Sequence, residues 1–234
     1  MKAVFDPSTL KGSVTAPPSK SAAHRSLIAA YLSGSECTID NIALSEDIKA
    51  TISCLEALGA DITVSQNSAY VKPALPKGNT LNCSESGSTL RFLIPPVLKT
   101  NRKITFCGSR KLFERPLSVY EKIAEENGFL FEKGDGRLTV KGSIKSGVYK
   151  IDGSISSQFI TGLLFALPTL ENDSIIEIMP PFESRSYVLI TLDILKKFGI
   201  SAELDGLMIK IPGGQKFSAE NITVEGDYSN AAYI

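Results

Sequence analysis

Five short segments carry the residue types that could do chemistry, and each is predicted to lead into a helix. The first runs from Pro17 to Arg25, where Lys20 and Arg25 stand beside serines that can cap a helix. Cationic groups, hydroxyls and free backbone N–H groups at a helix start favour binding of an anion. The other interpretation is an ordinary capped surface helix with solvated Lys and Arg side chains. His24, the one histidine of the chain, is interpreted as structural.

The second and third segments add glycine and arginine to this pattern. In residues 85–91, Gly87 lets a ligand approach the backbone, and Arg91 either faces an anion or pairs with a nearby glutamate. In residues 108–116, four charged side chains predict a solvated loop. Arg115 differs from the rest because it precedes a proline at a helix entrance, where its planar guanidinium can grip a phosphate or carboxylate through two hydrogen bonds.

The fourth and fifth segments are rich in hydroxyls. Residues 154–158 place adjacent serines at the start of an apolar helix, where each can donate a hydrogen bond to a phosphate oxygen. Residues 183–187 again put serines at a helix start. Redundant helix capping explains either segment when it is taken alone.

Composition and charge exclude several classes of function. The 25 basic and 25 acidic residues cancel, whereas non-specific binding to nucleic acid or to an anionic membrane needs a basic excess. The four cysteines are scattered without metal-ligand spacing, so we expect no metal and no disulfide, and reduced thiols favour a cytoplasmic protein. No apolar run approaches the ~20 residues of a membrane span. No dinucleotide-binding glycine motif follows a strand, so no cofactor is expected.

An internal repeat organises the whole chain, with a period of about 70 residues. Three serines that mark turns into apolar helices are 67 and 69 residues apart, and three glycines that end later helices are 69 and 71 residues apart. These markers are Ser21, Ser88 and Ser157, then Gly59, Gly128 and Gly199. The predicted unit is strand-helix-strand-helix-strand-strand, three times over, which gives an α/β fold (α+β in some schemes).

Local signals place the elements within each unit. Apolar residues at 48, 52, 55 and 58 form one helical stripe, with Ser45 as its cap and Gly59 at its end. The corresponding helix of the second unit is predicted to begin at Pro116. Strands are predicted within residues 36–42, 103–107 and 174–178, and a hairpin within 129–141.

The repeat favours one shared site for the five segments. Equivalent helix starts in a threefold repeat tend to converge near one axis, which would bring Lys20, Arg25, Arg91 and Arg115 together. A neutral protein would then have one cationic, hydroxyl-lined pocket suited to a small phosphate or carboxylate. The residues do not form the pattern of a Ser-His-Asp triad.

In the order and content of these motifs the chain resembles the 5-enolpyruvylshikimate-3-phosphate synthase family of 3-phosphoshikimate 1-carboxyvinyltransferases. The motifs are PSKSAAHR at 18–25, SEDIKATISCLEALGA at 45–60, ESGSTLRF at 85–92, ERP at 114–116, GSISSQF at 153–159 and ESRSYVLITLDILKKFG at 183–199. The resemblance implies an enolpyruvyltransferase-type fold of two lobes, each of three βαβαββ units, with the substrates in the cleft between them.

The resemblance also divides the chain. Residues 16–225 are expected to form the substrate-binding lobe, residues 1–15 to pack with a second lobe of the same polypeptide, and residues 226–234 to cross over and begin that lobe. Because residues 226–233 look like one more repeat opening, we expect the chain to be a fragment of a longer protein, monomeric when intact.

Roles for ten residues follow from the resemblance. Lys20, Ser21 and Arg25 match positions that contact shikimate 3-phosphate, and Lys20 also reaches phosphoenolpyruvate. Ser156, Ser157 and Ser184 match hydroxyls that hold the shikimate phosphate, and Gln158 matches a residue that touches both substrates. Gly87 and Arg115 match phosphoenolpyruvate contacts, and Tyr187 matches a neighbour of the shikimate.

The implied reaction transfers the enolpyruvyl group of phosphoenolpyruvate to the 5-hydroxyl of shikimate 3-phosphate and releases phosphate, by addition and then elimination. Lys20 is expected to assist proton transfer or to stabilise charge. Since the family's acidic base and several cations belong to the second lobe, we expect this chain alone to be inactive, with at most weak binding of shikimate 3-phosphate. Phe92 departs from the proline of many family members, with no predicted direction of effect.

Alternatives of other kinds stay open from the sequence. UDP-N-acetylglucosamine enolpyruvyltransferase shares the fold, but it typically has Lys-Asn where this chain has Lys20-Ser21, and a reactive Cys in a loop that is Cys-free here at residues 110–114. A non-catalytic phosphometabolite-binding or interaction module ending at Ile234 is a second alternative. An RNA-end-processing relative fits the neutral charge and these motifs poorly.

Overall fold

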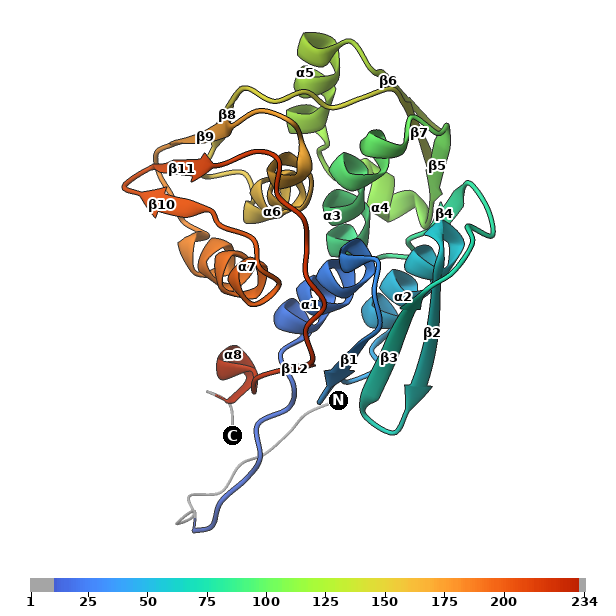
Figure 1. The fold of residues 1–234 in the computed structure, drawn as a ribbon, viewed down its shortest axis with the longest axis vertical. Helices are drawn as coiled ribbons and strands as arrows, with labels where there is room; N and C mark the ends of the chain where they lie inside the picture. Colours follow the sequence, from blue (N-terminus) through green and yellow to red (C-terminus); the bar gives the residue numbers. More distant parts are fainter. Residues whose placement is uncertain (1–10, 232–234) are drawn as a thin grey trace, which may run out of the picture.

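Three four-stranded sheets surround a group of helices in the computed structural model, which describes residues 11–231 (Figure 1). Each sheet belongs to one repeat unit and combines one parallel strand pair with an antiparallel hairpin. The alternation of buried and exposed residues along the strands turns one face of each sheet toward the helices. The predicted α/β class and the threefold repeat are confirmed.

The first unit contains two helices and three strands in chain order. They are α1 (Lys20–Ser33), β1 (Cys37–Asp40), α2 (Glu46–Leu58), β2 (Ala60–Ser65) and β3 (Ser68–Pro73). Ser45 caps α2 by accepting from the Ile48 N–H, as predicted, and α2 ends at Gly59. A side chain at position 59 would be strained, because φ is +120° and a Cβ would lie 2.9 Å from the Ala74 carbonyl.

The second unit is the longest. Its elements are β4 (Thr80–Asn82), α3 (Gly87–Val97) with a 3₁₀ turn at Leu98–Thr100, β5 (Ile104–Cys107), α4 (Arg110–Glu114), α5 (Ser118–Asn127), β6 (Leu130–Gly134) and β7 (Arg137–Lys141). The strand order is β4-β5-β7-β6, and β4 runs parallel to β5.

Two local predictions in this unit are wrong. Residues 110–114 form the one-turn helix α4 rather than a solvated loop, because Ser109 caps this helix and two of its own side chains, Leu112 and Phe113, are buried. The following helix begins at Ser118 rather than at Pro116. Arg115 stays extended between the two helices, as expected of a residue that precedes proline.

The third unit repeats the plan of the second. Its elements are β8 (Val148–Asp152), α6 (Ser157–Ala166) with a 3₁₀ turn at Leu167–Thr169, β9 (Ser174–Met179), α7 (Arg185–Lys197), β10 (Glu203–Asp205) and β11 (Met208–Ile211). The strand order is β10-β11-β9-β8, with β8 parallel to β9.

The opening strand of the first unit comes from the far end of the chain. After the third unit, β12 (Ile222–Thr223) pairs in parallel with β1, in the position that β4 and β8 hold in their own sheets. The prediction of three units contiguous in sequence therefore needs this correction. Pairing with β1 gives the otherwise open edge of the first sheet its hydrogen-bond partner.

Beyond β12, two more backbone hydrogen bonds join the C-terminal part of the described chain to the segment that leads into α1. The Ser19 N–H donates to the Glu225 carbonyl at 2.8 Å, and the Asp227 N–H donates to the Pro17 carbonyl at 2.7 Å. A short helix, α8 (Tyr228–Ala231), follows. Of the segments expected to pack with a second lobe or to begin it, residues 1–10 and 232–234 lie outside the described part. For residues 1–15 and 226–234 alike, the expectation stays a prediction.

The opening helices α1, α3 and α6 occupy the interior (Figure 1), and α3 packs directly on α6. Nearly every residue of α6 is buried, which explains its uniformly apolar sequence. Gly162 lies where α6 meets α3 and α5, and a Cβ there would collide with the Tyr120 hydroxyl and the Arg91 carbonyl. None of the helices in residues 11–231 has the length and hydropathy needed to cross a membrane.

Candidate active site

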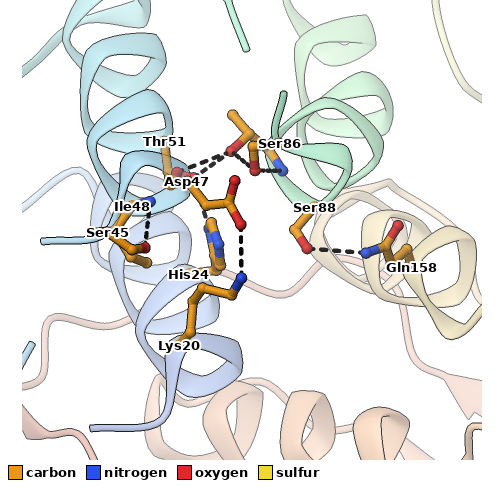
Figure 2. Close-up of polar contacts among 10 residues, drawn as sticks. Lys20, His24, Ser45, Asp47, Ile48, Thr51, Ser86, Ser88 and Gln158 are labelled. Atoms are coloured by element: carbon orange, nitrogen blue, oxygen red, sulfur yellow. Dashed lines mark hydrogen bonds and ion pairs between the residues drawn. The ribbon is translucent and has the colours of Figure 1, made fainter. Parts of the chain in front are cut away.

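The starts of four helices meet on one face of the structure (Figure 2). Lys20 at the start of α1 lies 2.7 Å from Asp47 in the first turn of α2. The Thr89 hydroxyl of α3 lies 3.5 Å from the Asp47 carbonyl, and Ser88 of α3 accepts from the Gln158 amide of α6 at 3.0 Å. Because each helix start carries unsatisfied N–H groups and partial positive charge, this face favours an anion.

Capping serines position these helix starts. Ser19, Ser45 and Ser86 each accept a hydrogen bond from the backbone N–H three residues ahead, at 3.2–3.3 Å. Ser156 caps α6 by accepting from the Gln158 N–H at 3.2 Å. Its hydroxyl therefore does the ordinary work of a cap, one of the two interpretations that the sequence allowed, while one hydroxyl proton stays available to a ligand.

Gly87 is surrounded by cationic side chains. A Cβ at this position would lie 2.9 Å from an Arg115 guanidinium nitrogen, 3.4 Å from one of Arg91 and 3.7 Å from the side-chain Oε1 of Gln158. The missing side chain thus lets two guanidinium groups approach the start of α3. Burial, together with the neighbouring Arg115 charge, lowers the pKa of Arg91. An anion placed between the two groups would offset their repulsion.

The two arginines differ in how firmly they are held. Arg91 donates to the side-chain Oε1 of Gln158 at 2.6 Å and to the backbone carbonyl of Pro116 at 3.0 Å, and its guanidinium lies 5.0 Å from the centre of the Phe159 ring. It does not pair with a glutamate, which was the alternative from the sequence. Arg115 is exposed, and its guanidinium makes no hydrogen bond or ion pair with the described residues, although its backbone N–H donates to the Leu112 carbonyl. One guanidinium is therefore fixed in place, while the other remains available to a ligand.

Lys20 is paired rather than free. Its side chain is half exposed, and the Asp47 carboxylate holds its ammonium group at 2.7 Å. Asp47 is not among the site residues predicted from the sequence, so its place beside Lys20 was missed. The signal that could have revealed it is its position in the first turn of a helix that opens beside the PSKSAAHR segment.

Arg25 lies in the interior, with 2% of its surface exposed. Its guanidinium donates to Thr191 at 2.7 Å, to the Ser21 carbonyl at 2.8 Å and, more weakly, to Thr161 and the Tyr187 carbonyl. It also lies 4.8 Å from the centre of the Phe92 ring. Burial lowers its pKa to about 9, so the group is still charged at neutral pH. Arg25 therefore joins α1 to α6 and α7, and substrate contact remains a prediction for it.

The remaining predicted residues lie at the starts of α1, α6 and α7. Ser21 and Ser157 are in the first turns of α1 and α6, and Ser184 immediately precedes α7. Within residues 11–231 the hydroxyls of these three serines make no hydrogen bond to another side chain. Tyr187 is in the first turn of α7 with its side chain exposed. Its roles, like those of the three serines, stay predictions.

His24 is a core residue, in agreement with its structural interpretation. It is 1% exposed, and its Nδ1 lies 2.7 Å from the Thr51 hydroxyl. Burial lowers its pKa to about 3, so the ring is neutral at physiological pH and is a poor proton acceptor.

This geometry defines a class of protein: a lobe of repeated units in which the starts of several helices form one face that carries cationic and hydroxyl side chains. The family model described as "EPSP synthase (3-phosphoshikimate 1-carboxyvinyltransferase)" matches residues 4–234. The chain belongs to the EPSP synthase family, whose members are carboxyvinyl transferases of the shikimate pathway.

Individual relatives agree with the family match. The 3-phosphoshikimate 1-carboxyvinyltransferase of Clostridium perfringens (strain SM101 / Type A) is 44% identical over 239 residues, which cover 99% of this chain and 56% of the relative. That of Clostridium acetobutylicum is 45% identical over 241 residues, covering 98% and 56%. The chain thus spans about half the length of the curated relatives it matches.

Solved structures show the same fold. An EPSP synthase from Acinetobacter baumannii superimposes with a TM-score of 0.82 at 22% identity, over 95% of this chain and 52% of that one. A second structure of the enzyme from that organism gives a TM-score of 0.78 at 21% identity. The fold of one lobe of an EPSP synthase is therefore confirmed for this chain, and the family match favours EPSP synthase over the UDP-N-acetylglucosamine enzyme.

Proposed function

We propose that residues 16–225 form the shikimate 3-phosphate-binding lobe of an enzyme that transfers the enolpyruvyl group of phosphoenolpyruvate to the 5-hydroxyl of shikimate 3-phosphate. The proposal rests on one observation: Arg91, Arg115 and Gln158 surround Gly87 at the start of α3. Two cations, an amide and helix N–H groups suit a small dense anion, and phosphoenolpyruvate is such an anion.

The two substrates divide the face between them in this proposal. Phosphoenolpyruvate lies near Gly87 and Arg115, with Gln158 touching both substrates. The phosphate of shikimate 3-phosphate is held by a serine set at the starts of α6 and α7, and the rest of that molecule lies near α1 and Tyr187. The serines are Ser156, Ser157 and Ser184.

The proposed reaction has two steps. In the first, the 5-hydroxyl oxygen attacks C2 of phosphoenolpyruvate, a proton reaches its methylene carbon, and the hydroxyl proton leaves. In the second, phosphate departs and the methyl group returns a proton, which restores the double bond. Lys20 is placed to move a proton or to stabilise developing charge, and Asp47 holds its ammonium group in position.

The complete reaction requires more than this lobe. Because the relatives are nearly twice as long, we propose that a second lobe of the same polypeptide supplies the remaining groups, with residues 1–15 and 226–234 at the junction. The 234 residues alone are then inactive and bind shikimate 3-phosphate weakly. The four free cysteines of the described part support a cytoplasmic location, and we propose a monomer and no nucleic-acid partner for the intact enzyme.

Calorimetric titration of the chain with shikimate 3-phosphate tests the binding proposal. Ser157→Ala removes one donor to the phosphate and is expected to weaken binding by about 1–3 kcal/mol. Ser154→Ala is the matched control, because Ser154 is exposed and donates its hydroxyl to Asp152. Equal losses for the two variants, or no binding by the wild type, would contradict the proposal. Binding without turnover even when a second lobe is present would instead favour the non-catalytic module.

A further inference from the structure

One buried hydroxyl group occupies an equivalent position in the last α-helix of each repeat unit. These are Thr51 on α2, Tyr120 on α5 and Thr191 on α7, at most 1% exposed and spaced by 69 and 71 residues. Each stands eight residues before the glycine that follows its helix. The repeat therefore preserves a hydroxyl at this position although its side chain changes from Thr to Tyr.

The first hydroxyl links the opening helices of the first and second units. Thr51 lies 2.7 Å from His24 Nδ1 on α1 and 2.7 Å from the Thr89 hydroxyl on α3 (Figure 2). Thr89 continues the chain of contacts by donating to the Ser86 hydroxyl at 2.7 Å. Since Ser86 caps α3, this chain of contacts ends immediately before Gly87.

The second hydroxyl links the opening helices of the second and third units. The Tyr120 hydroxyl lies 2.7 Å from the Arg91 carbonyl on α3 and 3.2 Å from the Phe159 carbonyl on α6. Burial raises the pKa of Tyr120 well above its usual range, so the group stays a donor. The residue whose backbone it holds is the fixed arginine of the candidate site.

The third hydroxyl closes the ring between the third and first units. Thr191 accepts from Arg25 Nε on α1 at 2.7 Å, lies 2.9 Å from the Thr161 hydroxyl on α6, and donates to the Tyr187 carbonyl at 2.9 Å. Thus each hydroxyl lies between two of the three opening helices. Tyr120 contacts Arg91 and Thr191 contacts Arg25, while Thr51 contacts Thr89 in the first turn of α3.

We infer that Thr51, Tyr120 and Thr191 are positioning residues, which fix how the three opening helices are placed relative to one another, and that Thr191 in particular orients Arg25 for the substrate. Apolar packing alone tolerates small sliding movements, whereas a buried donor that loses its acceptor destabilises the arrangement. The predicted role of Arg25 as a substrate contact rests on the proposed function; the placing of α1 by Thr191 does not.

Nuclear magnetic resonance of the chain and calorimetry with shikimate 3-phosphate test the inference at Thr191. In the wild type, the Arg25 Nε–H proton is expected to exchange slowly with water because its acceptor is buried. Thr191→Val keeps the shape but removes the acceptor, so this proton should exchange faster, backbone amide signals at the start of α1 should shift, and binding should weaken roughly tenfold. Thr191→Ser keeps the hydroxyl and should restore all three properties.

Thr139→Val is the matched control, since Thr139 forms a threonine–threonine hydrogen bond with Thr105 on the β5–β7 ladder. It should change neither the α1 signals nor binding. Fast exchange of the Arg25 Nε–H in the wild type would overturn the inference whether or not any variant folds. Unchanged α1 signals in Thr191→Val would overturn it as well. If the wild type binds no shikimate 3-phosphate, the proposed function fails, and the exchange and amide signals still decide the positioning role.

Discussion

The ammonium group of Lys20 and the carboxylate of Asp47 lie 2.7 Å apart and join the start of α1 to the start of α2. Both side chains are partly exposed, so the pair contributes little to stability. Its importance lies in charge: a dianionic ligand that reaches Lys20 must compete with Asp47 for the same ammonium group.

This competition predicts that Asp47→Asn strengthens binding of shikimate 3-phosphate to the chain, by roughly two- to fivefold at low salt, since an exposed pair is worth less than about 1 kcal/mol. Glu46→Gln is the matched control because it removes the same charge from the same helix turn while its partner is Lys49. Calorimetry at two salt concentrations measures both variants. An equal effect of the two substitutions would show that Asp47 acts only through net charge.

Gly87→Ala is expected to leave the fold intact and to impair the anion site. The added Cβ would lie 2.9 Å from Arg115, whose exposed guanidinium is flexible enough to move away. We therefore expect an unchanged urea midpoint and a weaker apparent affinity for phosphoenolpyruvate in the complete transferase. Gly78→Ala, where a Cβ meets open space, is the control. A loss of stability without loss of affinity would contradict this interpretation.

Gly162→Ala is expected to do the opposite and destabilise the fold. Its Cβ would collide with the Arg91 carbonyl and the Tyr120 hydroxyl, groups that are held by the packing of α3 and α5. Overpacking of this kind costs about 1–3 kcal/mol, occasionally more. Urea denaturation measures the loss against Gly134→Ala, which has nothing within 4 Å of its added Cβ. Similar midpoints for the two variants would refute the close approach of α6 to α3.

The burial of His24 predicts that the free energy of unfolding falls in mild acid. Its pKa is about 3 in the folded chain and 6.5 in the unfolded one, so between these values the unfolded state binds more protons and unfolding becomes easier as pH falls. From pH 7 to pH 5 this group alone should remove about 2 kcal/mol. His24→Gln should flatten that part of the profile. Because the chain has one histidine, its ring signal reports the titration directly, and an ordinary pKa near 6.5 would disprove the assignment.

Much of the fold could be predicted from the sequence because interactions between neighbouring residues determine the helices of each repeat unit. Ser45 and Gly59 bound a helix through capping and a positive φ, both properties of neighbouring residues. The stripe at Ile48, Ile52, Leu55 and Leu58 is buried as its spacing indicates. By contrast, the pairing of β12 with β1 joins residues about 180 positions apart, and no local pattern encodes it.

The site was predictable by residue type and less so by geometry. Convergence of the helix starts followed from the repeat, which predicted that Lys20, Arg25, Arg91 and Arg115 come together. The structure brings Arg91 and Arg115 together around Gly87. The burial of Arg25 could not be foreseen, because a guanidinium one turn into a helix is usually solvated, and here three other helices supply its partners and its ring contact. Asp47 was missed because its partner comes from another helix.

The pairing of β12 with β1 has a consequence for how the chain is made. During synthesis, β1 leaves the ribosome long before residues 222 and 223, so the first sheet must wait with one edge uncovered while the two later units are produced. The first unit reaches its final form only when the third is already present. Folding of this lobe is therefore completed at the first sheet, when the late-synthesised strand β12 pairs with the early-synthesised strand β1.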